Sequence, residues 1–113
     1  MQNRTMSPAI QIVTTTEKRE DAEKIAGMLI DRRLAACVQV VGPVFSTYRW
    51  EANVESSQEW QCQIKTSAER YHDVEAVIRD HHPYKVPEII AMPIVQGSQD
   101  YLAWLYRAVS DES

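Results

Sequence analysis

Two periodic patterns of hydrophobic and polar residues occur along this chain and predict its helices and strands. Apolar residues spaced three and four positions apart predict amphipathic helices over residues 20–34, 66–81 and from 98 onward. Apolar or alternating runs predict extended segments over residues 9–16, 35–50, 60–65 and 88–95. The order β-α-β-β-α-β with an extra C-terminal helix predicts an α+β, ferredoxin-like fold, in which two helices cover one face of an antiparallel sheet.

The clearest alternation predicts a long hairpin. Tryptophan, cysteine and isoleucine at 60, 62 and 64 alternate with polar residues, and residues 44–50 form the opposing arm after a bend at Gly42-Pro43. We expect the turn at Ala52-Asn53, with Asn53 at a positive φ. This turn places Cys62 opposite position 43, roughly 20 Å along the strand from Cys37. A disulfide between the two cysteines is therefore excluded.

Local signals mark where the second helix begins and where the last strand is interrupted. Thr66-Ser67-Ala68-Glu69 matches the capping box, in which a hydroxyl and a carboxylate satisfy the first backbone donors of a helix. Pro83 ends that helix because its ring cannot continue the hydrogen-bond pattern. Pro93 lies within the final apolar run, so we expect it at an edge or a bulge of the sheet.

The segment from His81 to Ile90 must end a helix, form a rigid corner and begin a strand. Pro83 and Pro87 fix their own φ and bias the preceding residues toward extended conformations. Two imidazoles, a phenol, an ammonium and a carboxylate lie within eight residues of this segment. This segment is therefore the first candidate for chemistry.

Length and charge bound the class of protein. With 113 residues, of which 44% are hydrophobic, we expect a single domain over 9–110, a frayed N-terminus over 1–8 and a frayed end over 111–113. A net charge of -4 without a Lys/Arg cluster argues against nucleic acid as a partner. The chain lacks an apolar run of about 20 residues and a signal peptide, so we expect a cytoplasmic protein without a membrane partner.

No pattern of catalytic residues is present. The sequence has no nucleophile paired with a base, no metal triad and no phosphate-binding loop, and its three glycines, at 27, 42 and 97, are too scattered for a nucleotide fingerprint. Hydrolases and RNA-binding proteins exist on this fold, but the fold alone does not imply either function. We therefore expect a protein that is not an enzyme and that requires no cofactor.

Five clusters of residues carry a resemblance to a known family. They are Leu34-Ala35-Ala36-Cys37, Tyr48-Arg49-Trp50-Glu51, Lys65-Thr66, His81-His82-Pro83-Tyr84 with Pro87-Glu88, and Asp100-Tyr101-Leu102 followed by Trp104. In these clusters and their separations the chain resembles the CutA family, the divalent-cation tolerance proteins, from about Ile12 to about Trp104. The resemblance implies a ferredoxin-like subunit in a tight homotrimer whose shape is similar to that of PII signalling proteins.

The resemblance implies an interface for the hairpin aromatics. In the family the long hairpin pairs with neighbouring subunits, which would bury Tyr48, Trp50 and Trp60 at the trimer interface. The same three side chains are alternatively a ligand-binding box. Lys65, Tyr84 and Glu88 are candidates for a ligand cleft between subunits, although Lys65 and Glu88 are alternatively a solvated pair.

The resemblance also implies a metal site. The family proposal combines a cysteine at the end of the first strand with the two histidines that are His81 and His82 here, but the matching position holds Thr14. A threonine hydroxyl does not replace the thiolate that selects copper. Adjacent helical residues also diverge by about 100°, so we expect Cu or Zn to bind weakly, with water or a neighbouring subunit completing the shell. The alternative is that both imidazoles merely cap the helix C-terminus.

Two functions follow as hypotheses. The first is a non-catalytic homotrimer in divalent-cation (copper) tolerance that binds divalent metal ions weakly. The second is a PII-like signalling or scaffold trimer that binds a small ligand or a partner protein in the cleft between subunits.

Overall fold

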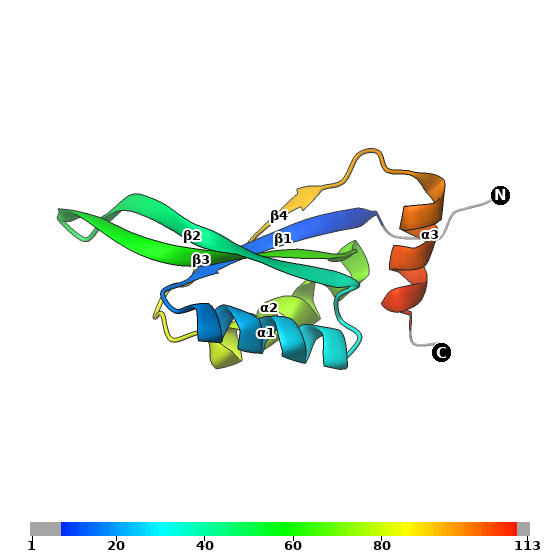
Figure 1. The fold of residues 1–113 in the computed structure, drawn as a ribbon, viewed down its shortest axis with the longest axis horizontal. Helices are drawn as coiled ribbons and strands as arrows, with labels where there is room; N and C mark the ends of the chain where they lie inside the picture. Colours follow the sequence, from blue (N-terminus) through cyan, green and yellow to red (C-terminus); the bar gives the residue numbers. More distant parts are fainter. Residues whose placement is uncertain (1–7, 111–113) are drawn as a thin grey trace.

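A four-stranded antiparallel sheet carries two helices on one face and a third helix at one end (Figure 1). The computed structural model describes residues 8–110, and the expectations for 1–7 and 111–113 lie outside them. The elements are β1 (Ala9–Thr16), α1 (Arg19–Asp31), β2 (Cys37–Trp50), β3 (Asn53–Ser67), a short 3-10 helix (Ala68–Arg70), α2 (Tyr71–His81), β4 (Ile90–Pro93) and α3 (Gln99–Ala108). The strands lie in the order β2-β3-β1-β4. The predicted ferredoxin-like α+β fold with an extra C-terminal helix is confirmed.

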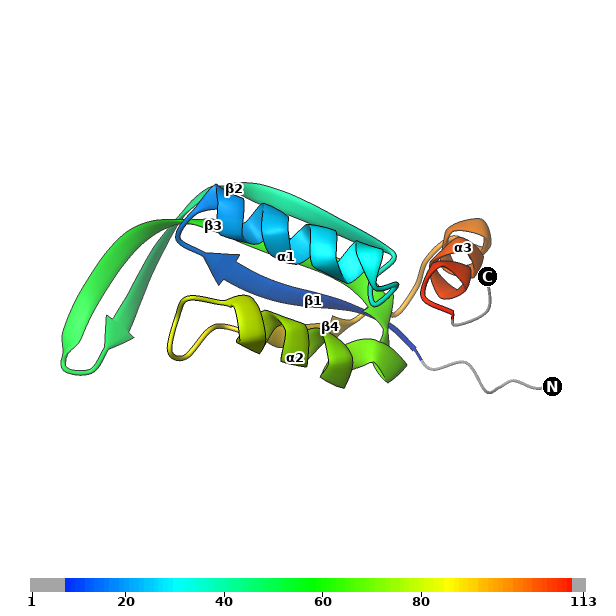
Figure 2. The same ribbon diagram turned by 90° about the horizontal axis from the view of Figure 1, so that it is seen from below.

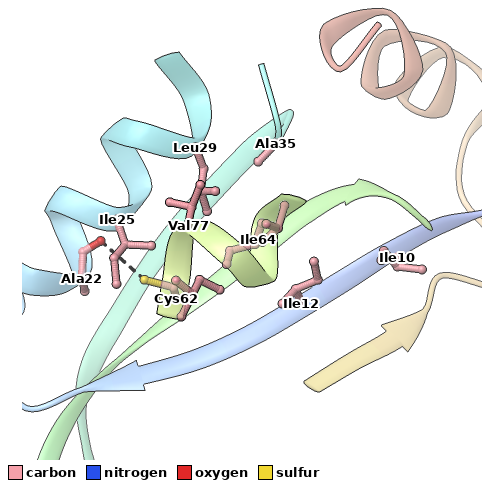
Figure 3. Packing of buried hydrophobic residues seen from close by; sticks show 11 residues of the cluster. Ile10, Ile12, Ala22, Ile25, Leu29, Ala35, Cys62, Ile64 and Val77 are labelled. Atoms are coloured by element: carbon pink, nitrogen blue, oxygen red, sulfur yellow. Dashed lines mark hydrogen bonds between the residues drawn. The ribbon is translucent and has the colours of Figure 1, made fainter. Parts of the chain in front are cut away.

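The hydrophobic core lies between the sheet and helices α1 and α2 (Figures 2 and 3). Alternate residues of β1 and β3 point toward the helices, and every third or fourth residue of each helix points back. The buried set is Ile10, Ile12, Ala22, Ile25, Leu29, Ala35, Cys62, Ile64, Val74, Val77 and Ile78. Most of the apolar positions predicted on α1 and α2 therefore form this core, but Ile30, also predicted on the apolar stripe of α1, is 45% exposed.

The hairpin turn lies one residue earlier than predicted. Strand pairing runs out to Trp50 opposite Asn53, so the turn residues are Glu51 and Ala52. The positive φ of 56° belongs to Glu51, and the prediction of Asn53 is wrong. The alternation along both arms sets the register, and a shift by one residue would move every side chain to the other face. That constraint outweighs the preference of a single asparagine for the turn.

The bend predicted at Gly42-Pro43 is confirmed as a break in the pairing of β2 with β3, between Val41 and Val44. A Cβ atom on Gly42 would lie 2.5 Å from Cε3 of Trp60. Trp60 therefore packs directly on the backbone at this bend. No residue larger than glycine fits there without a shift of the indole.

The cysteines are closer in register than predicted. Cys62 pairs with Val40, and Cys37 pairs with Lys65, so three positions along β3 separate them rather than six along β2. The early turn and the break at Gly42 account for the error. An odd separation places their side chains on opposite faces of the sheet, and both thiols are free.

The capping box predicted at Thr66 does not form. Strand β3 continues to Ser67, whose side chain makes no cap hydrogen bond, and α2 itself begins at Tyr71. The Thr66 hydroxyl instead donates to the carbonyl oxygen of Leu34 at 2.7 Å. A tertiary hydrogen bond therefore uses the hydroxyl that the local pattern assigned to a helix cap.

Helix α1 ends three residues before the predicted limit. Arg33 adopts a φ of 59°, and the backbone N–H of Leu34 donates to the carbonyl of Leu29 at 2.9 Å. This pair of features is the Schellman motif, which satisfies the last carbonyls of a helix. The Arg33 guanidinium donates to the carbonyls of Arg107 and Ser110 at 3.2 Å each, which ties the end of α1 to the end of α3.

Strand β4 is shorter than the predicted 88–95, and it lies at the edge of the sheet beside β1. Pro93 is its last residue, as expected for a proline on an edge strand. Helix α3 begins after Ser98, whose Oγ accepts from the N–H of Tyr101. It buries Leu105 but leaves Tyr101 and Trp104 exposed on this chain.

Candidate functional site

The corner between α2 and β4 has the backbone course that its prolines predict. His82 is the C-cap of α2 and is extended, with φ -87° and ψ 132°. The chain then crosses to β4 without helix or strand from His82 to Ile89. This course places His82 and Tyr84 against the sheet rather than in solvent.

Both ring nitrogens of His82 are hydrogen bonded. The side chain is buried, and Nε2 lies 2.6 Å from the carbonyl oxygen of Thr15, to which it must donate. Nδ1 accepts from the backbone N–H of Tyr84 at 3.1 Å. Both bonds require the neutral ring with its proton on Nε2. His82 therefore fastens the corner to the end of β1 and offers no free lone pair to a metal ion.

His81 presents the other arrangement. Its Nδ1 lies 3.0 Å from the carbonyl of Val77, which can only accept, so Nδ1 carries the proton. Within residues 8–110 its Nε2 has no hydrogen-bond partner. A backbone carbonyl on one ring nitrogen commonly orients a histidine whose other nitrogen binds a metal. The adjacent imidazoles therefore do not converge, and only His81 is suited to be a ligand.

Thr14, at the position of the family cysteine, does not complete a metal site. It is fully buried on the helix side of the sheet, opposite Cys62, and within residues 8–110 its Oγ1 has no hydrogen-bond partner. In the part of the chain that the structure describes, no group of three or more His, Cys, Asp or Glu side chains could hold an ion. The donors of the described residues therefore fit a single imidazole ligand and no closed shell.

Cys62, opposite Thr14, is a buried thiol with one weak partner. Its Sγ lies 3.5 Å from the carbonyl of Ala22 (Figure 3). Burial raises the pKa of the Cys62 thiol from 9.0 to about 11. The thiol is therefore neutral in the folded chain over a range where it ionises in the unfolded chain.

This difference predicts a pH-dependent stability. A raised native pKa contributes stability that is fully present below pH 9 and is lost as the pH rises through 11. Between these limits the stability advantage of wild type over Cys62→Ala should shrink by up to about 2–3 kcal/mol. Urea unfolding of both proteins at a series of pH values measures it. A constant difference across the range would contradict the assignment.

A cavity of about 590 Å³ lies where the hairpin meets the α2–β4 corner. Figure 2 shows the hairpin extending past the end of β1 and bending toward the side on which the α2–β4 corner lies. The walls come from the end of β1, from both hairpin arms and from the corner. Their residues are Thr15, Ser46, Thr47, Tyr48, Trp50, Glu55, Glu59, Tyr84, Lys85, Val86 and Glu88.

Two of the three predicted cleft residues line this cavity. Tyr84 and Glu88 are on its wall. Lys65 is not, because it pairs with Gln11 of β1, four residues along that strand from Thr15, which lines the cavity. The Lys65 ammonium donates to Oε1 of Gln39 at 2.6 Å. The structure therefore does not bring Lys65 and Glu88 together.

Glu59 is one of the site residues that the sequence did not reveal. It is 5% exposed, and its Oε2 accepts from the Tyr84 hydroxyl at 2.6 Å. Burial raises the pKa of Tyr84 well above its usual value, and the hydrogen bond to Glu59 and the charge of Glu59 add to this rise. In the sequence Glu59 is one polar residue in an alternating strand, so only the fold distinguishes it from a solvated glutamate.

The three hairpin aromatics divide between two locations. Tyr48 and Trp50 line the cavity and are 42% and 44% exposed. Trp60 instead packs on Gly42, with the Arg19 guanidinium 5.4 Å from the ring centroid. Trp60 is therefore held within its own chain, whereas the other two rings remain open to a ligand or a second subunit.

Comparison with known proteins gives a consistent result. The model of the family described as CutA1 divalent ion tolerance protein matches residues 10–108. The divalent-cation tolerance protein CutA of Thermus thermophilus is 39% identical over 94 residues, covering 83% of this chain and 91% of the relative.

Solved structures agree with this match. The crystal structure of CutA from Xylella fastidiosa has a TM-score of 0.88 and 36% identity, with 92% of this chain and all of that chain covered. A protein of Archaeoglobus fulgidus described as periplasmic divalent cation tolerance protein CutA has a TM-score of 0.88 and 33% identity, covering 90% and 99%. Within residues 8–110 every helix is too short or too polar to span a bilayer. This chain belongs to the CutA1 divalent ion tolerance family.

Proposed function

We propose that this protein acts in divalent-cation tolerance as a non-catalytic, cytoplasmic homotrimer that binds divalent cations, copper among them, weakly. The observation that carries the proposal is the family match over residues 10–108. In this proposal the protein requires no cofactor and has no nucleic-acid or membrane partner. The A. fulgidus relative is described as periplasmic, so cell fractionation is the test of the compartment.

Exposed apolar side chains support the trimer. Phe45 and Val54 on the hairpin are 76% and 64% exposed, and Ile90 and Met92 lie exposed on the edge strand. Apolar surface of this kind on a single chain marks an interaction site. Native mass spectrometry should give three times the 13.0 kDa subunit mass, and a monomer at micromolar concentration would contradict the proposal.

Weak metal binding is supported by the geometry of His81. We expect His81→Ala to weaken Cu(II) binding by about tenfold or more, because it removes the one oriented imidazole with an open nitrogen. Isothermal titration calorimetry with Cu(II), repeated with Zn(II), measures the change. His72→Ala is the matched control, since His72 is exposed on the same helix. Equal isotherms for wild type and His81→Ala would contradict the site.

The cavity favours a second candidate function, a PII-like signalling or scaffold trimer that binds a small ligand or partner protein. Tyr84 and Glu88 line this cavity, and the rigid proline corner positions both. Glu88→Ala should then alter ligand or partner capture and leave Cu(II) binding unchanged. Lys65→Ala, which lies outside the cavity in the single chain, tests whether a neighbouring subunit brings Lys65 into the site.

A further inference from the structure

The charges around the cavity are unbalanced. Glu55, Glu59 and Glu88 contribute carboxylates to the lining, and Lys85 contributes the single ammonium. Within residues 8–110, Lys85 forms no ion pair with any of the three. The lining therefore holds three carboxyl groups against one ammonium, and none of the three forms an ion pair within residues 8–110.

Glu59 holds one carboxylate oxygen in a hydrogen bond and leaves the other accessible. It is 5% exposed, and its sole hydrogen bond within the described residues is the one from Tyr84 to Oε2. Its Oε1 has no donor there and is not enclosed by protein, so it is open to the cavity that Glu59 lines. A buried carboxylate is costly unless a cation or several donors compensate it. The cavity is where such a cation can reach Glu59.

The arrangement does not suit a bare metal ion. A metal ion needs several ligands that converge within bonding distance, and no group of three acidic, histidine or cysteine side chains in residues 8–110 meets that requirement. The carboxylates are instead spread over β3 and the corner. A cation with a body long enough to extend between them fits this spacing better.

Aromatic and apolar residues supply a wall for such a body. Tyr48, Trp50 and Val86 line the cavity and are each more than a third exposed. Aromatic faces attract ammonium groups, and apolar walls bury hydrocarbon. A volume of about 590 Å³ is within the range of small-molecule sites.

We propose that this cavity binds a small organic cation, a primary ammonium group on an aromatic or apolar body, with the ammonium at Glu59 and the body against Tyr48 and Trp50. The proposal rests on the second candidate function only in placing a ligand in this cavity. It is independent of metal binding at His81.

The probe is 2-phenylethylammonium, titrated at neutral pH into the assembled wild-type protein and followed by calorimetry and tryptophan fluorescence. The matched control ligand is 2-phenylethanol, which has the same ring and ethyl chain but carries a neutral hydroxyl in place of the ammonium group. We expect the ammonium to bind at least about tenfold more tightly than the alcohol. Equal affinities would overturn the choice of a cation while leaving the cavity as a ligand site.

Two pairs of variants locate the binding. Glu59→Gln keeps an acceptor for the Tyr84 hydroxyl and should weaken ammonium binding by about tenfold or more without changing alcohol binding. Glu20→Gln removes the same charge from the exposed surface of α1 and should have no effect. Trp50→Leu should weaken ammonium binding several-fold. Trp104→Leu should not change it, because Trp104 lies on α3 and does not line the cavity.

Failure of the proposal has distinct forms. Binding that is unchanged in Glu59→Gln would overturn the placement of the ammonium. Absence of binding of either probe up to about 10 mM would overturn the site and also count against the second candidate function. Circular dichroism and thermal unfolding of each variant show that a lost signal is not lost folding. Cu(II) titration of the same samples reports the metal function separately.

Discussion

Replacement of Leu29 by alanine is expected to lower the free energy of unfolding by about 2–5 kcal/mol. Leu29 is fully buried in the cluster that joins α1 to the sheet and to α2. The substitution removes apolar atoms from the core and leaves a cavity that helices on a twisted sheet fill only in part. Urea unfolding followed by circular dichroism at a fixed subunit concentration measures the loss.

The adjacent residue is the control for this prediction. Ile30 occupies the next position of the same helix but is 45% exposed. Ile30→Ala should therefore change the free energy of unfolding by less than about 1 kcal/mol. Losses of equal size at the two positions would contradict the assignment of the core to the Leu29 face of α1.

Replacement of His82 by leucine is expected to cost about 2–4 kcal/mol of the free energy of unfolding. The carbonyl of Thr15 would lose a hydrogen-bond partner in a buried position, and the N–H of Tyr84 would lose one in a partly buried position. Leucine fills much of the space and keeps water from replacing the imidazole. Each buried polar group left without a partner costs about 1–3 kcal/mol.

His72→Leu provides the comparison, because His72 lies exposed on α2 and should tolerate the change within about 0.5 kcal/mol. Hydrogen exchange at the amide of Tyr84 gives a second readout, since that N–H loses its acceptor. We expect faster exchange at Tyr84 in His82→Leu. Unchanged stability and exchange would show that His82 does not fasten the corner.

The separation of the two histidines assigns them different tasks. His82 is a structural residue that holds the α2–β4 corner on β1, and His81 is the imidazole with an open nitrogen. The corner in turn delivers Tyr84 to Glu59 and forms one wall of the cavity. The proposed metal site therefore uses His81, whereas the proposed cation site depends on the corner that His82 holds in place.

Part of the candidate site was predictable from local chemistry. Prolines at 83 and 87 fix an extended backbone, so the corner and the gathering of Tyr84 and Glu88 near it follow from the sequence. Glu59 was not predictable in this way. It is remote in sequence from Tyr84, and only the pairing of β3 within the sheet brings the two side chains to 2.6 Å.

The sequence by itself determined the order of elements, the apolar faces of α1 and α2, and the bend at Gly42, because periodicity and backbone restrictions are local properties. Tertiary structure alone decided the hairpin register that moved the turn to Glu51, and the use of the Thr66 hydroxyl by Leu34. It also decided which histidine keeps an open nitrogen and which glutamate is buried. These features depend on distant partners for hydrogen bonds and on packing, and no periodic pattern along the chain encodes those partners.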